Sequence, residues 1–454
     1  MATFYLTTAI DYSNGEPHLG HAVEKIGADA IARYRRSLGD DVHFLIGMDE
    51  HGQKVAQEAA ERGSSPREWV DRIAGTFLDA WGRLAISFDD FIRTTEERHH
   101  AGVRALMERI RAAGDFYLAT YEGYYCAGCE AFKKEEELEG GQCPLHPQRE
   151  IEWTEEKNWF FRLSSYRDRL LEHVRAHPEF IRPESRRNEI LRLLEGGLDD
   201  ISASRSRIPW GVDFPGDEGH TVYVWFDALP NYITAIGFPD GEAFASWWPA
   251  DLHIIGKDIT RFHCVIWPAM LMSAGIELPR AVWGHGFLSV AGVKLSKSAG
   301  TQLDLDALID RHGPDALRFF LLREMPWDGD RNFASLEDFL EGFDRRYTTD
   351  LANDLGNLLN RVVSMIAKYR EGRMPAASDD SPLDMQRTAA LGRYVEAMDA
   401  YRLHDGLAAA FEIVRAANVY VDDSEPWGLA KAERAGAAPE ALDATLGSLA
   451  RALT

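Results

Sequence analysis

The hydrophobic positions near the start of the chain follow the order expected for a parallel α/β sheet. Residues 3 to 10 alternate and then become apolar, and residues 42 to 52 form an apolar run that ends in polar residues. Between them, residues 19 to 38 place apolar positions at helical spacing up to Gly39. A strand, a helix and a second strand in this order predict a parallel sheet, whose ligands bind at the carboxyl ends of the strands.

The pattern changes further along the chain. From about residue 117 to 215 the chain becomes rich in Cys, Glu and Arg, so we expect an insertion in the sheet. Strand-like runs at 220 to 232 and 251 to 259 predict that the sheet resumes there. From about residue 345 the spacing is helical almost to the end, interrupted near 371 to 382, and it predicts a helical C-terminal domain.

The composition fits a protein of several globular domains. The chain has 454 residues, 45% of them hydrophobic, and no apolar run reaches the roughly 20 residues that span a bilayer. The N-terminal MATFYLTTAI has no charged start or cleavage site typical of a signal peptide, so we expect a cytoplasmic protein with no membrane segment. The net charge of −23 argues against non-specific coating of nucleic acid, although it allows a local contact surface.

Three of the four cysteines, together with one histidine, have the spacing of a zinc site. Cys126 and Cys129 form a C-x₂-C pair, and after thirteen intervening residues Cys143 and His146 form a C-x₂-H pair. Four such ligands suit tetrahedral Zn²⁺ and leave no open position, so this zinc would stabilise a small subdomain and would not catalyse. Cys264 has no partner nearby in sequence and is predicted to be a small core residue.

One pair of histidines and one pair of lysines are candidates for phosphate binding. His18 and His21 lie three apart at a predicted helix start, where free N–H groups and the helix dipole attract anions. Lys294 and Lys297 lie three apart in a loop of small residues, and their ammonium groups could neutralise a triphosphate. Each pair taken alone is equally compatible with a helix cap or a solvated loop.

Taken together, the two motifs resemble the signatures of class I aminoacyl-tRNA synthetases. HLGH (18 to 21) resembles the HIGH signature, and KLSKS (294 to 298) resembles the KMSKS signature. Other segments, among them TTAIDYSNGEPHLGHA, GMDEHG, FIRTTEERH, YVWFDALPNY and IIGKDITRFHCVIWPAML, are similar to methionyl-tRNA synthetases over most of the first 300 residues. The single short insertion agrees, because the synthetases for leucine, isoleucine and valine carry a much larger editing domain.

The resemblance implies an α/β protein built from a Rossmann-like parallel sheet, an inserted zinc-knuckle connective domain and a C-terminal α-helical bundle. The two halves of the catalytic fold are expected at 1–116 and 216–280, and the connective domain at 117–215. A linker carrying the KMSKS loop, which contacts the tRNA stem, is expected at 281–344, and the anticodon-binding helices at 345–454.

The resemblance also implies the activity. The enzyme would join L-methionine to ATP, giving methionyl-adenylate and pyrophosphate, and then transfer methionine to the 3′-terminal adenosine of initiator and elongator tRNA(Met). One structural Zn²⁺ per chain and Mg²⁺ with ATP are the expected cofactors. The implied catalytic residues are His18, His21, Lys294 and Lys297, and the implied ATP-binding residues are these four with Gly256 and Asp258.

The remaining site residues are carried over by position. Asp49 would bind the α-ammonium group of methionine, and an apolar, aromatic lining would suit its thioether. The implied lining consists of Ala9, Ile10, Tyr12, Trp225, Ala228, Leu229, Tyr232, Ile259, Phe262, His263 and Trp267. Asn357, Arg361 and Trp427 match anticodon-reading positions, where stacking and polar side chains read unpaired bases.

Three departures from the family pattern leave alternatives open. Asp11 stands where the family usually has an aromatic residue or proline, Leu295 replaces the methionine of KMSKS, and the sequence stops earlier than is usual. The Leu295 change conserves volume and is expected to be harmless. Asp11 and the short C-terminus leave an adenylate-forming paralogue with a non-tRNA acceptor as an alternative, and a noncatalytic RNA-binding protein on the same scaffold is a second one. The sequence contains no recognisable dimerisation module, and it leaves the oligomeric state open.

Overall fold

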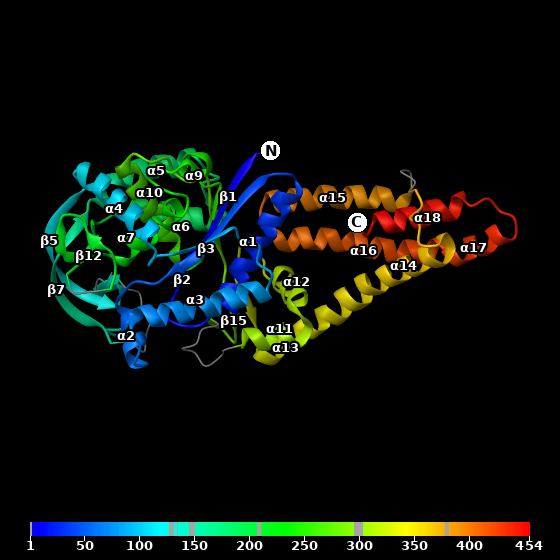
Figure 1. Cartoon of the computed structure of the whole chain (residues 1–454), viewed down its shortest axis with the longest axis horizontal. Coiled ribbons are helices and arrows are strands. Elements are labelled where there is room, and N and C mark those ends of the chain that lie inside the picture. The colour runs from blue at the N-terminus through cyan, green and yellow to red at the C-terminus, as the bar shows by residue number, and fades with distance from the viewer. Residues whose placement is uncertain are drawn as a thin grey trace. The chain divides into compact units, whose positions relative to one another are not determined.

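The computed structural model describes residues 2–126, 131–133, 135–144, 150–206, 210–294, 303–376 and 381–454. The chain divides into two compact units, residues 1–285 and 286–454. The first contains the large sheet, and the second is mainly helical (Figure 1). No helix in the described ranges is both long enough and apolar enough to cross a membrane.

A parallel sheet of seven strands forms the centre of the first unit, as the sequence predicts. Its order is β2-β3-β1-β13-β14-β8, and β4 pairs with residues 45–48 of β3. Five consecutive residues of β1, from Phe4 to Thr8, are buried, so both faces of the sheet are covered, which explains the nearly continuous apolar runs. The strands are β1 Thr3–Thr8, β2 Asp11–Tyr12, β3 Asp41–Asp49, β4 Asp90–Arg93, β8 Ile181–Arg182, β13 Leu252–Gly256 and β14 Val282–His285.

Helices connect these strands and share one buried core with them. The core joins the sheet to α4, α10 and the first strand of the insertion through Tyr5, Leu106, Phe116 and Trp267. The longer helices are α1 Leu19–Ser37, α2 Gln53–Glu61, α3 Pro66–Arg83, α4 Glu97–Ala112, α5 Arg167–Ala176, α6 Glu184–Gly196 and α10 Trp267–Ala274. Three short helices, α7 Val224–Ala228, α8 Asn231–Thr234 and α9 Glu242–Trp247, precede β13.

The insertion forms two small antiparallel sheets. One has the order β6-β5-β7-β9, with β5 Phe116–Cys126, β6 Ala131–Lys133, β7 Glu152–Phe161 and β9 Ile201–Ser202. The other has the order β10-β12-β11, with β10 Ser204–Arg205, β11 Asp213–Phe214 and β12 Asp217–Val222.

One prediction about the sheet is wrong. Residues 220 to 232 do not rejoin the parallel sheet, because β12 pairs antiparallel with β10 and β11 and the following residues form α7 and α8. Periodicity alone cannot separate a short strand from a short helix in an apolar run such as VYVWFDAL, so the run did not show where β12 ends and α7 begins. The parallel sheet resumes at β13, as predicted for 251 to 259, and it also takes in β14 and the two residues of β8.

The second unit begins with a small sheet and continues as helices. Its sheet has the order β16-β15-β17, with β15 Leu288–Val290, β16 Val293–Lys294 and β17 Arg331–Phe333. A π-helical segment, Tyr347–Gly356, joins α13 to α14, and the predicted interruption falls between α14 and α15. The helices are α11 Leu305–His312, α12 Pro314–Glu324, α13 Leu336–Arg346, α14 Asn357–Arg370, α15 Pro382–Asp399, α16 Leu403–Ser424, α17 Pro426–Arg434 and α18 Glu440–Arg451.

Candidate active site

The start of α1 places two histidines side by side. His18 is the N-cap, and its Nδ1 accepts a hydrogen bond from the Gly20 N–H at 3.1 Å. His21 Nδ1 accepts from the His18 N–H at 3.2 Å, and the two rings stack with their centroids 3.7 Å apart. Because each Nδ1 accepts from the backbone, the hydrogen of each neutral imidazole lies on Nε2. Two N–H donors and the positive end of the helix dipole therefore favour a phosphate here.

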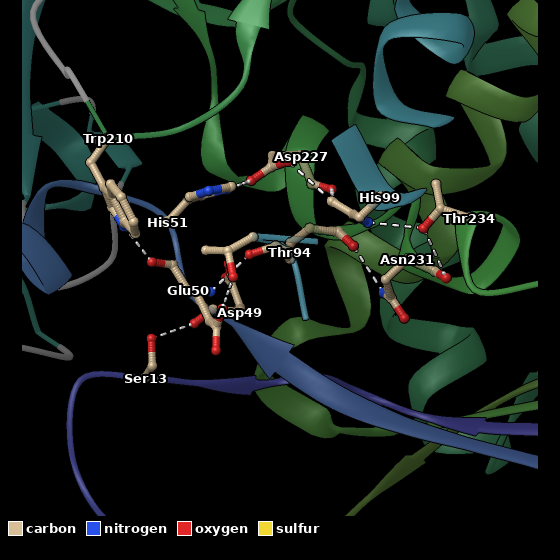
Figure 2. Close-up of polar contacts among 12 residues, drawn as sticks. Ser13, Asp49, Glu50, His51, Thr94, His99, Trp210, Asp227, Asn231 and Thr234 are labelled. Carbon is tan, nitrogen blue, oxygen red and sulfur yellow. Dashed lines mark hydrogen bonds and ion pairs between the residues drawn. The ribbon is translucent and has the colours of Figure 1, made fainter. Parts of the chain in front are cut away.

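The carboxyl end of β3 presents Asp49. Its carbonyl oxygen accepts from the Ser13 N–H at 2.9 Å and from the Ser13 hydroxyl at 2.8 Å (Figure 2). Two residues earlier, a Cβ at Gly47 would come within 2.2 Å of the Ile92 carbonyl oxygen, so β4 can approach β3 this closely only where glycine stands. Backbone contacts on both sides therefore fix the position of Asp49.

A buried polar network links the loop after Asp49 to α7, α8 and α4. His51 Nδ1 lies 2.5 Å from Oδ2 of Asp227, and His99 Nε2 lies 3.2 Å from its Oδ1 (Figure 2). His99 Nδ1 also lies 2.9 Å from the Thr234 hydroxyl oxygen. Burial opposes ionisation of Asp227, but the charges and hydrogen bonds of the two histidines outweigh it and hold the pKa of this carboxyl well below its usual value.

Aromatic side chains of α7, α8 and the segment after β13 lie against one another. Tyr232 Oη is 2.7 Å from His263 Nε2, and His263 Nδ1 is 3.0 Å from the Ile259 carbonyl oxygen. Trp225 and Phe262 stack with centroids 3.7 Å apart and an interplanar angle of 11°. Nδ1 donates to a carbonyl, so in the neutral ring Nε2 accepts from the Tyr232 hydroxyl.

The burial of His263 gives the protein an acid-sensitive group. Desolvation lowers the pKa of His263 to about 4, although the Ile259 carbonyl favours the charged form. Between the ordinary histidine pKa near 6.5 and about 4, the unfolded chain binds a proton that the folded chain does not, so stability is complete above pH 6.5 and falls as the pH drops. We expect acidification from pH 6.5 to pH 5 to lower the free energy of unfolding by about 2 kcal/mol through this residue.

Urea unfolding at both pH values, compared between the wild type and His263→Gln, isolates the contribution of this residue. The other buried histidines are retained in the variant, so their effects cancel in the comparison. An equal loss in both proteins would show that His263 does not titrate in this window.

Three more predicted site residues, Ala9, Gly256 and Asp258, lie at or just beyond the carboxyl ends of strands. Gly256 ends β13, and Asp258 lies in the 3₁₀ turn that follows it. Ala9 lies between β1 and β2, and its N–H donates to the Ile254 carbonyl at 2.9 Å. Because β2, β3, β1 and β13 are parallel neighbours, their carboxyl ends bring His18, Asp49 and Gly256 to one edge.

Part of the predicted zinc and lysine chemistry lies outside the described residues. Cys129, His146 and Lys297 are in the gaps, whereas Cys126 and Cys143 are buried and Lys294 belongs to β16. The described ranges contain no group of three or more His, Cys, Asp or Glu side chains placed to hold a metal ion. Since two of the four ligands fall outside these ranges, the zinc knuckle stays a prediction.

The three predicted anticodon residues lie in the helices of the second unit. Asn357 is exposed at the first position of α14, and Arg361 follows one turn later on the same helix. Arg361 forms an ion pair of 2.7 Å with Asp422 of α16. Trp427, on α17, is 47% exposed, which is unusual for a tryptophan that only fills a core.

Sequence reasoning missed the polar network around Asp227. Its two histidines come from different loops and helices, so no local spacing could join them. The sequence nevertheless contained a signal that these residues lie near the site. His51 is two residues from Asp49, and Asp227 lies between the predicted pocket residues Trp225 and Ala228.

Known proteins resemble the whole chain. A family model described as "tRNA synthetases class I (M)" matches residues 4–150 and 147–363. The methionine–tRNA ligase of Thermotoga maritima is 47% identical over 437 residues, covering 94% of this chain and 68% of the relative. That of Mycobacterium tuberculosis is 47% identical over 442 residues, covering 95% of this chain and 84% of the relative.

Solved structures agree. The Mycobacterium tuberculosis methionyl-tRNA synthetase in complex with methionyl-adenylate has a TM-score of 0.93 and 45% identity, and the likeness covers 100% of this chain and 90% of that one. Its apo form has a TM-score of 0.85 and 41% identity, with 100% and 88% covered.

The parallel sheet and the histidine pair that caps α1, together with the family match, define a class I aminoacyl-tRNA synthetase. The chain is 47% identical to relatives named methionine–tRNA ligase, and it has the fold of a solved methionyl-tRNA synthetase. It therefore belongs to the methionyl-tRNA synthetase family.

Proposed function

We propose that this chain activates L-methionine with ATP and transfers it to tRNA(Met), both initiator and elongator. One observation carries the proposal: Asp49 and Gly256 end the parallel strands β3 and β13, and His18 caps the helix that follows β2, in a chain of this family. An ammonium partner, a phosphate-binding helix start and a nucleotide-binding strand end are what the formation of an aminoacyl-adenylate needs.

Asp49 and the aromatic residues would hold methionine. The Asp49 carboxylate would pair with the α-ammonium group, since a partly buried ion pair both binds and orients a small ligand. The thioether would lie among the stacked Trp225 and Phe262 and beside Tyr232, because sulfur makes favourable contacts with ring edges. The proposed lining also includes Ala9, Ile10, Tyr12, Ala228, Leu229, Ile259, His263 and Trp267.

Adenylate formation is an in-line displacement. A carboxylate oxygen of methionine attacks the α-phosphorus of ATP, and the bond between this phosphorus and the bridging oxygen breaks as pyrophosphate leaves. His18 and His21 would donate Nε2–H bonds to the phosphate oxygens, while Lys294 and Lys297 would offset the charge that develops on pyrophosphate. Magnesium bound with ATP would neutralise further phosphate charge. Catalysis of this kind needs positioning rather than a covalent nucleophile.

The second unit would bind the tRNA. Exposed Trp427 offers a stacking surface for an unpaired base, and Asn357 and Arg361 offer donors for base edges. Asp422 orients the Arg361 guanidinium through their ion pair. We propose that residues 345–454 form the anticodon-binding domain and residues 281–344 the linker, with the catalytic halves at 1–116 and 216–280.

We also propose a structural zinc site in the connective domain, 117–215. Burial of Cys126 and Cys143 fits ligands of a closed site, and Cys129 and His146 would complete the tetrahedron. A cytoplasmic location belongs to the same proposal, because charging of tRNA serves translation there.

The test is amino-acid-dependent exchange of labelled pyrophosphate into ATP, measured with each of the twenty amino acids. We expect exchange with methionine alone, followed by charging of tRNA(Met). Methionine exchange without charging would indicate a paralogue with another acceptor. No exchange with any amino acid, in folded protein supplied with zinc and magnesium, would overturn the proposal in favour of a noncatalytic RNA-binding protein.

The same assay separates the histidine pair from the rest of the site. His21→Ala removes one phosphate donor, so methionine-dependent exchange should fall about 100-fold. The thermal unfolding midpoint checks that the fold is kept, since His21 also accepts a backbone hydrogen bond at the start of α1.

A further inference from the structure

Lys25 of α1 is fully buried and contacts the segment that carries proposed methionine-pocket residues. Lys25 Nζ is 2.8 Å from Glu24 Oε1, 3.2 Å from Asp11 Oδ1 and 2.9 Å from the Ala9 carbonyl oxygen. The Lys25 side chain is 0% exposed, and the carboxylates of Asp11 and Glu24 are 5% and 10% exposed. An ammonium group has three hydrogens, so these three acceptors satisfy it completely. Glu24 Oε2 is also 3.2 Å from His285 Nε2.

The position of Lys25 on α1 makes this contact more than a local ion pair. His18, His21 and Lys25 are spaced by three and four residues, so they lie along one face of the helix. The Ala9 carbonyl and Asp11 belong to the segment that leads from β1 through β2 to Tyr12. Lys25 therefore ties the helix face that carries the phosphate donors to the segment that carries three of the methionine-pocket positions.

Burial of Lys25 with Asp11 and Glu24 is costly unless the geometry compensates, and desolvation raises the pKa of Asp11 to about 7 even beside Lys25. An apolar pair of the same volume would hold the helix against the strand at least as well, so packing alone does not explain the triad. What an apolar pair lacks is a directed bond to the Ala9 carbonyl. The triad also accounts for Asp11, whose carboxylate departs from the aromatic residue or proline usual in the family.

We propose that Lys25, oriented by Asp11 and Glu24, is a positioning residue that sets the Ala9–Tyr12 segment in register with the His18–His21 face of α1. It thereby fixes the methionine site relative to the phosphate site. Methionine's carboxylate must meet the α-phosphorus at a defined distance and angle, so a loss of this register lowers productive binding of methionine. The inference rests on the proposed function for its kinetic readout, and it has a second readout that does not.

Three variants test the proposal. Lys25→Met keeps the length of the side chain but leaves Asp11 buried without its partner, so the unfolding midpoint should fall by about 5 °C or more. In Lys25→Met/Asp11→Ala no unpaired Asp11 remains and Glu24 keeps its contact with His285, so the midpoint should recover in part. The KM for methionine in pyrophosphate exchange should stay raised about tenfold or more in both, because nothing holds the Ala9 carbonyl.

Arg33→Met is the matched control on the same helix. Arg33 pairs with the buried Asp29 at 2.7 Å and donates to the Ala85 carbonyl, away from the Ala9–Tyr12 segment. Its loss should lower the unfolding midpoint and leave the KM for methionine unchanged. An equal rise in KM in this control, or a normal KM in the double variant, would overturn the positioning role.

Hydrogen–deuterium exchange supplies the readout that needs no activity. The Ala9 and Ser13 amides donate to Ile254 and Asp49, so their exchange reports how firmly the segment is held. We expect faster exchange over residues 9–13 in the double variant and unchanged exchange in Arg33→Met. A wild type that exchanges no pyrophosphate with methionine would defeat the proposed function, whereas unchanged protection in the double variant would defeat the role of Lys25.

Discussion

Asp49→Asn is expected to lower methionine-dependent pyrophosphate exchange by about 100- to 1,000-fold at subsaturating methionine. The amide keeps the shape of the carboxylate but removes its charge, which would leave the substrate's ammonium group desolvated without a counter-ion. Breaking such a pair costs about 3 to 5 kcal/mol, and 1.4 kcal/mol corresponds to a factor of ten. The loss should appear mainly in the KM for methionine, because the ion pair forms when the substrate binds.

The fold should survive this substitution. Ser13 holds Asp49 through the backbone carbonyl, and the approach of β4 depends on Gly47, so neither contact uses the carboxylate. Asp41→Asn makes the same chemical change at the exposed, amino end of β3 and should leave the kinetics unaltered. An unchanged KM for methionine in Asp49→Asn would assign the ammonium group to another residue.

The elements around the site were predictable because each has a recognisable local sequence pattern. A buried strand followed by a polar turn marks β1 and β3, and helical spacing that ends at Gly39 marks α1, which the structure ends at Ser37. The motif HLGH could be placed at the helix start from sequence, and the cap formed by His18 explains why the helix begins there. The gap between α14 and α15 was predictable for the same reason.

The elements that the sequence did not reveal depend on distant partners. β8 is two residues long and exists because Ile181 and Arg182 pair with β14, about a hundred residues later. Lys25 looks like an ordinary helix residue, and only the fold places it against Ala9 and Asp11. A buried charge cannot be inferred from local spacing, because it is stable only beside partner groups, and the fold brings these together from distant parts of the sequence.

The network around Asp227 is such a case, and it carries the second large prediction. Asp227→Asn should lower the free energy of unfolding by about 3 to 5 kcal/mol at pH 7. His51 and His99 both point a ring nitrogen at this carboxylate, and an amide offers one acceptor oxygen and one N–H₂ group in its place. One histidine would then face a donor in a fully buried site. Thr234→Val leaves Asp227 intact and removes the contact of the Thr234 hydroxyl with His99 Nδ1 and its longer one, 3.4 Å, with the Asn231 carbonyl, so it should cost about 1 kcal/mol.

The pH dependence distinguishes loss of this charge from a general packing defect. A carboxyl whose folded pKa is lowered stabilises the protein above its ordinary pKa of 3.8, and that stability is lost as the pH falls below this value. The difference between the wild type and Asp227→Asn should therefore shrink as the pH falls from about pH 4 to pH 3, as measured by urea unfolding. A difference that does not change with pH would mean that the amide disturbs packing, and that His51 and His99 do not hold α7 through the charge of Asp227.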